Sequence, residues 1–122
     1  MRAATRTQLS YVHRQRSFNV GRRELRHVAR MISIVAPSWS VKLHNVPAEV
    51  TSIQVLAEPN EDVTEAMYII WRTQAGFHLD QLRCDVYMEL DTFASIWELI
   101  SYLRSLIAQS AAMASPVSVM CH

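Results

Sequence analysis

The stretch "EAMYIIWRTQAGFHLDQLRCDVYMEL", residues 65–90, decides the fold. Its first part, residues 65–73, places large apolar side chains at consecutive positions, which is typical of a strand covered on both faces. Gln74 to Gly76 is typical of a short hairpin loop, with a glycine at a position suited to a positive φ. Residues 77–90 largely alternate apolar and polar side chains and predict one returning antiparallel strand.

The alternation in this returning strand changes near Asp80. Even-numbered positions from Leu82 to Leu90 are apolar, whereas Phe77 and Leu79 are the large apolar residues before Asp80. One extra residue in a strand, a β-bulge, would restore a continuous apolar face. We therefore expect a bulge near Asp80.

Two more strands are expected earlier in the chain. Alternation over residues 39–44 predicts a half-buried strand that Pro47 stops, and residues 50–57 form a second candidate. The segment "EPNED", residues 58–62, is rich in residues that favour tight turns. Short connections of this kind favour an antiparallel meander.

A first helix is expected before these strands, from Arg22 to just before Pro37. Asn19 is the candidate cap. The alternative is a short strand over residues 31–35, because isoleucine and valine favour sheets. Apolar residues at helical spacing support the helix: Leu25, Val28, Ala29, Ile32 and Val35.

A second helix is expected after the strands, capped by Asp91 or Thr92 and ending near Gln109. Its apolar stripe is wider than one contact face, so the helix should cover the sheet and a further surface. The stripe comprises Phe93, Ile96, Trp97, Leu99, Ile100, Leu103, Leu106 and Ile107.

The sequence thus predicts one α+β domain. We expect a four-stranded antiparallel meander with a flanking N-terminal helix and a C-terminal helix packed on one face, in the order α-β-β-β-β-α. A chain of 122 residues fits a single domain. We assign residues 21–109 to this domain, residues 1–20 to a basic, disordered arm and residues 110–122 to a flexible tail.

The function favoured by the wide apolar stripe is a small, non-enzymatic protein–protein interaction or regulatory module. Such a protein would self-associate, as a homodimer, through its C-terminal helix, or would bind another protein partner. Trp97, Leu99 and Leu106 widen the stripe and are the candidate interface residues.

Charge suggests an alternative function. Residues 1–30 hold eight arginines and one acid, and the other residues hold four basic side chains and ten acids, which gives charges of +7 and −6. Clustered arginines bind phosphates through salt-sensitive contacts. The alternative is therefore a nucleic-acid-binding protein. A targeting segment, a solvated tail or a start at Met31 would also explain the stretch. The candidate nucleic-acid contacts are Arg14, Arg16, Arg22, Arg23, Arg26 and Arg30.

The sequence contains no recognisable catalytic, cofactor or metal motif, and we predict none of these sites. His78, Asp80 and Cys84 share a strand parity, but the chain from 78 to 84 spans about 20 Å, too far for one ion. Cys84 is expected to be a small buried hydrophobe. An enzyme is not the expected class, although a pocket joining His78 or His44 to an acid would favour one.

Localisation is expected to be cytoplasmic. No run of about 18 apolar residues predicts a membrane span. The two widely spaced cysteines, Cys84 and Cys121, form no disulfide framework and indicate a reducing compartment, with pairing of the two thiols as the alternative. The Arg-rich, acid-poor N-terminal segment is also typical of mitochondrial targeting, which stays an alternative.

Overall fold

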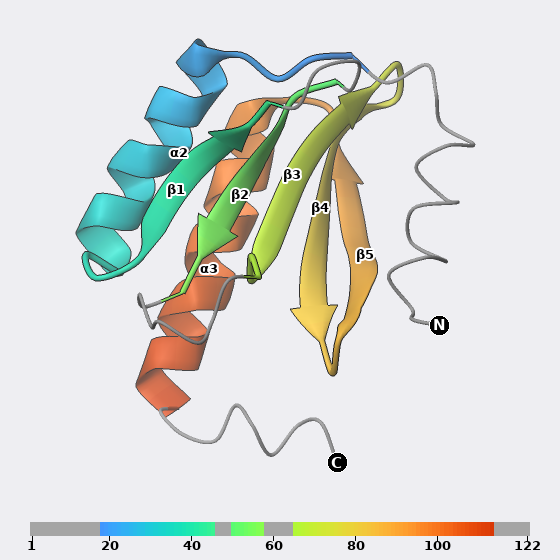
Figure 1. The fold of residues 1–122 in the computed structure, drawn as a ribbon. Helices are drawn as coiled ribbons and strands as arrows, with labels where there is room; N and C mark the ends of the chain where they lie inside the picture. Colours follow the sequence, from blue (N-terminus) through green and yellow to red (C-terminus); the bar gives the residue numbers. More distant parts are fainter. Residues whose placement is uncertain (1–17, 46–49, 58–64, 114–122) are drawn as a thin grey trace.

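The computed structural model describes residues 18–45, 50–57 and 65–113. In chain order these residues form helix α2 (Arg22–Val35), strands β1 (Ser40–His44), β2 (Ser52–Leu56), β3 (Tyr68–Thr73), β4 (Gly76–Arg83) and β5 (Val86–Phe93), and helix α3 (Ile96–Met113). Neighbouring strands are antiparallel and the sheet order follows the chain order. Both helices lie on one face of the sheet (Figure 1). The predicted α+β class is confirmed.

The prediction of four strands was wrong, because the described sheet has five. Residues 77–90 were expected to form one strand, but the chain reverses between Arg83 and Val86, which pair with each other. The two residues of the turn, Cys84 and Asp85, have φ values of 50° and 70°. Positive φ at both central positions is the geometry of a type I′ hairpin turn. The usual Asn-Gly or Asp-Gly signal is missing here, so the pattern did not reveal the turn.

Because of this hairpin, the last helix begins later in the chain than expected. Asp91 and Thr92 were expected to cap it, but both belong to β5, and α3 begins at Ile96. The hydroxyl of Ser95 takes the capping role and accepts a hydrogen bond from the Glu98 N–H at 3.2 Å. The helix also continues to Met113, past the expected end at Gln109 and into the predicted tail.

A bulge lies beside Asp80, as the change in alternation indicated. Leu79 pairs with Asp91, whereas Asp80 pairs with Glu89, so Leu90 is the extra residue and it lies on β5. Residues three apart on a regular strand point to opposite faces. Because of the bulge, Glu89 shares the face of Thr92, three positions further along.

Helix α2 is confirmed with its predicted bounds, and the alternative strand over residues 31–35 was wrong. The cap differs, because Gly21 occupies that position and its N–H donates to Glu24 Oε1 at 2.9 Å. Asn19, the expected cap, instead accepts a hydrogen bond from the Thr51 N–H at 2.8 Å.

The core lies between the two helices and the sheet face that they cover. Strand residues at alternate positions contribute to it, since alternate side chains share a face. Helix α3 contributes residues four apart, which form one stripe of the helix. The largest fully buried side chains are Ile32, Ile53, Tyr68, Ile70, Leu79, Leu99, Leu103 and Ile107.

The folded unit begins before α2. Phe18 forms a bridge with Arg72 of β3. Val20 is only 1% exposed, and its N–H donates to the hydroxyl of Thr51 at 2.8 Å. Both residues fall within the stretch 1–20 that was expected to be a disordered arm. The rest of that arm, the "EPNED" turn and the tail from residue 114 lie outside the described residues.

Candidate functional sites

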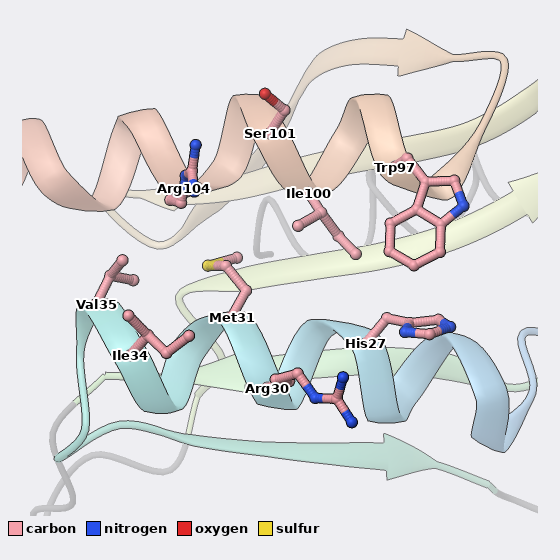
Figure 2. A pocket seen from close by; sticks show the side chains of 9 residues that line it. All are labelled: His27, Arg30, Met31, Ile34, Val35, Trp97, Ile100, Ser101 and Arg104. Carbon is pink, nitrogen blue, oxygen red and sulfur yellow. The ribbon is translucent and has the colours of Figure 1, made fainter.

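A groove with a volume of about 410 Å³ runs between α2 and α3, on the side of the helices away from the sheet (Figure 2). Met31 and Ile100 point into it from the two helices. The lining residues come from α2 (His27, Arg30, Met31, Ile34, Val35) and from α3 (Trp97, Ile100, Ser101, Arg104).

Two large apolar side chains of this groove are unusually exposed. Ile34 is 74% exposed and Trp97 is 58% exposed. The Trp97 ring packs against the His27 ring, with centroids 4.3 Å apart and an interplanar angle of 53°. This contact holds the indole in place while much of its surface stays in water. Exposed apolar side chains gathered around one groove mark an interaction surface more often than isolated ones do.

The charge around the groove is positive. Arg30 and Arg104 line it from opposite helices, and no acidic residue lines it. Both guanidinium groups are on exposed residues, and neither forms an ion pair within the described part of the chain. Arg22, Arg23 and Arg26 are also exposed on α2. The groove therefore combines apolar contact area with cations that are not neutralised.

The three predicted interface residues occupy different environments. Trp97 lines the groove and is largely exposed. Leu99 is 0% exposed and belongs to the core, so it offers no surface to a partner in this fold. Leu106 is partly buried and packs against the core. Of the three, only Trp97 lies at the groove.

The six predicted nucleic-acid contacts fall into two groups. Arg14 and Arg16 lie outside the described residues. The other four arginines, Arg22, Arg23, Arg26 and Arg30, project from exposed positions of α2. That helix is part of the folded unit, because Val28 and Ile32 on its other side are buried. These four arginines therefore belong to the domain surface and not to a separable arm.

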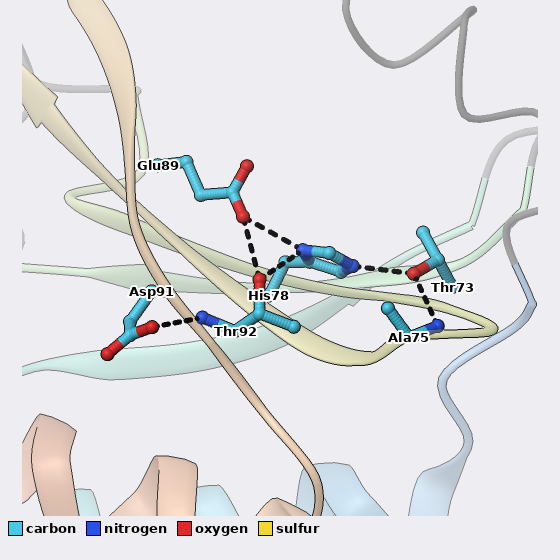
Figure 3. A network of polar contacts seen from close by, with 6 residues as sticks. All are labelled: Thr73, Ala75, His78, Glu89, Asp91 and Thr92. Atoms are coloured by element: carbon cyan, nitrogen blue, oxygen red, sulfur yellow. Dashed lines mark hydrogen bonds and ion pairs between the residues drawn. The ribbon is translucent and has the colours of Figure 1, made fainter.

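A polar network forms a second site on the opposite face of the sheet, where His78 joins three strands (Figure 3). Its Nδ1 lies 3.0 Å from Glu89 Oε2 and 2.9 Å from Thr92 Oγ1. Its Nε2 lies 2.6 Å from Thr73 Oγ1. Trp71 stacks on the imidazole with ring centroids 4.3 Å apart. Carboxylate, imidazole and hydroxyl therefore follow one another in one line of hydrogen bonds.

The hydrogen-bond acceptors around the neutral His78 ring indicate which ring nitrogen carries the proton. Ionised Glu89 only accepts hydrogen bonds, so Nδ1 carries the proton and donates toward Glu89 and Thr92. The Thr92 hydroxyl in turn donates to Glu89 Oε2 at 2.8 Å. Nε2 is left with a lone pair and accepts a hydrogen bond from the Thr73 hydroxyl. The oxygen of Thr73 accepts from the Ala75 N–H at 3.1 Å.

The bulge in β5 and the burial of His78 determine the positions of Glu89, His78 and Thr73 in this network. Glu89 reaches His78 because the extra residue Leu90 turns it to the face of Thr92. His78 is 5% exposed, whereas Thr73 is half-buried beside the exposed turn at Gln74 and Ala75. The imidazole of His78 is therefore buried, and the Thr73 hydroxyl lies at the end of the network that is nearest the surface.

Sequence reasoning identified His78 but none of its partners. Thr73, Glu89 and Thr92 come from three strands, so no local spacing connects them. The alternation break near Asp80 was the one available signal, because it marked the bulge. His78, Asp80 and Cys84 do not converge: within the described ranges, no three potential ligands are placed to hold a metal ion.

Cys84 differs from its predicted role. It lies exposed in the β4–β5 turn and is disulfide-bonded, whereas a small buried hydrophobe was expected. The sequence contains one other cysteine, Cys121, which lies outside the described residues. A disulfide is not what the expected reducing compartment favours.

Tyr87 on β5 has a strongly raised pKa. Burial, reinforced by the negative charge of Glu65, raises the pKa of Tyr87 to about 12. Its hydroxyl donates to the Ala66 carbonyl at 2.8 Å, which keeps the phenol in place. Tyr87 is therefore a structural hydrogen-bond donor at neutral pH.

Comparisons with known proteins add no functional information. No protein-family model matches the chain, and no curated protein or solved structure is significantly similar to it. In the described part of the chain, neither helix has the length and apolar character needed to cross a bilayer. The geometry of the two sites is therefore the basis for inferring a function.

Proposed function

We propose that the protein is a binding module whose α2–α3 groove binds an acidic, amphipathic segment of a partner protein. The observation that carries this proposal is the pairing of exposed Ile34 and Trp97 with Arg30 and Arg104 around one groove. Amphipathic helices dock in this way, with apolar anchors in the groove and charges along its rim. An acidic partner supplies the opposite charge to the two arginines.

The same charges disfavour self-association through this surface. A symmetric dimer uses the same patch on both copies. Two such grooves placed face to face would bring Arg30 and Arg104 of one copy close to the same arginines of the other. Like charges across an interface oppose association. A partner protein with acids thus fits the groove better than a second copy of this chain.

A labelled synthetic helix tests the proposal. The peptide carries leucines at positions i, i+3, i+4 and i+7, with glutamates along both sides, and its binding is followed by fluorescence anisotropy. A second peptide replaces the glutamates with lysines. We expect the acidic peptide to bind more tightly, by about tenfold or more, and its affinity to fall as salt rises. Equal binding of the two peptides would contradict the proposal.

Matched variants locate the binding surface. Arg104→Glu lies at the groove, whereas Arg22→Glu makes the same charge change at an exposed position of α2 outside the lining. Ile34→Ser removes an exposed apolar group at the groove, and Met88→Ser does so on β5, where Met88 is 47% exposed. We expect weaker peptide binding only for the first variant of each pair.

Two other outcomes would favour the functions predicted from the sequence. A solution mass of twice that of the chain, lost in Ile34→Ser, would support a homodimer. Binding to a nucleic-acid duplex that Arg22→Glu and Arg104→Glu weaken equally would indicate phosphate contacts spread over the helices. Either result would replace the acidic partner proposed above.

A further inference from the structure

We propose that Thr73 is an activated hydroxyl which accepts an acyl group from small activated esters, with His78 as its general base and Glu89 as the group that positions the imidazole. The proposal is independent of the α2–α3 groove, since these residues lie on the other face of the sheet. It rests on the two hydrogen bonds that connect a carboxylate, an imidazole and a hydroxyl in sequence.

The distances suit this role. A nucleophile and its base must lie within about 2.6–3.2 Å of each other, and a third group must orient the base. Thr73 Oγ1 lies 2.6 Å from His78 Nε2, and Glu89 Oε2 lies 3.0 Å from Nδ1. Because Glu89 holds the proton on Nδ1, the free lone pair of Nε2 faces the hydroxyl that must lose its proton. Stacking on Trp71 fixes the plane of the ring.

The step balances without another reactant. Thr73 Oγ1 bonds to the carbonyl carbon of the ester while its proton moves to His78 Nε2. The bond from that carbon to the leaving oxygen then breaks, and the proton on Nε2 departs with it as an alcohol or phenol. The Ala75 N–H donates to Thr73 Oγ1 at 3.1 Å and so fixes the position of the attacking oxygen.

The position of Thr73 limits the substrate class. The residue lies next to the exposed hairpin turn Gln74–Ala75, away from the groove between the helices. Because Thr73 does not line that groove, the proposal is restricted to small esters with a good leaving group. Small aryl esters are the appropriate probes.

The full-length protein is treated with p-nitrophenyl acetate, and p-nitrophenol release is followed with time. Trypsin is expected to release residues 73–83 as one peptide, because it cleaves after Arg72 and after Arg83. Fragmentation of this peptide then distinguishes Thr73 from His78. We expect one acetyl ester, on Thr73. Acetylation confined to other residues would overturn the proposal.

Variants separate chemistry from structural support. Thr73→Val should abolish the ester, and Thr73→Ser should restore it with a native circular dichroism spectrum. His78→Ala should slow acetylation by about 100-fold or more. The matched control is Ser105→Ala, which removes an exposed hydroxyl from α3, outside the network, and should retain the ester. Labelling of His78→Ala equal to that of Ser105→Ala and Thr73→Ser would show that the network only supports the hairpins.

Discussion

Replacing Leu99 by alanine should destabilise the domain far more than replacing Trp97, two positions earlier on the same helix. Leu99 is 0% exposed and belongs to the core between α3 and the sheet. Leucine-to-alanine changes at such sites cost about 3–4 kcal/mol, because apolar burial is lost and a cavity remains. Trp97 is 58% exposed and contacts the His27 ring, so Trp97→Ala should cost about 1 kcal/mol or less.

Urea denaturation followed by circular dichroism distinguishes these magnitudes. With a slope of about 1.5 kcal/mol per molar urea, the midpoint should fall by about 2 M for Leu99→Ala and by well under 1 M for Trp97→Ala. Unchanged slopes would show that both variants unfold as the wild type does. Equal midpoint shifts, or a larger shift for Trp97→Ala, would refute the assignment of Leu99 to the core and Trp97 to the surface.

Three further predictions follow from packing and burial. Gly76→Ala should cost about 3 kcal/mol or more, measured by the same denaturation, because φ is 134° and an added Cβ would lie 2.2 Å from the Phe93 carbonyl oxygen. A chain that starts at Met31 should fail to give a cooperative thermal transition, because it lacks buried Val28 and most of α2. Stability should fall as pH rises from about 10 to about 12, since unfolded Tyr87 ionises first while its folded pKa is about 12; Tyr87→Phe should remove this part of the pH dependence.

The elements with regular periodicity were predictable from the sequence. Helix α2 was found with its bounds because its buried residues recur at helical spacing and Pro37 follows. The β4–β5 hairpin was not found, because Cys84 and Asp85 adopt positive φ without a glycine. Counting one long strand in place of this hairpin then shifted the expected start of α3 into β5.

The sites were predictable only in part, because they depend on tertiary register. The stripe of α3 was too wide to show which apolar residues face the sheet, so Leu99 and Trp97 received the same role. The partners of His78 lie on three strands, and a one-residue register shift decides whether Glu89 faces it. Helix rotation and strand register are set by packing, which the linear pattern does not contain.

The extra residue in β5 has a consequence for how the length of this strand can vary. Leu90 is the position without a counterpart on β4, so a chain that lacks it would have an unbroken ladder with Glu89 and Thr92 still side by side on one surface. A single-residue insertion between Glu89 and Thr92 would not preserve this arrangement. It would require a second bulge, or it would place the Glu89 carboxylate on the other face of the sheet. Natural length changes in β5 should therefore be deletions at residue 90 more often than insertions nearby.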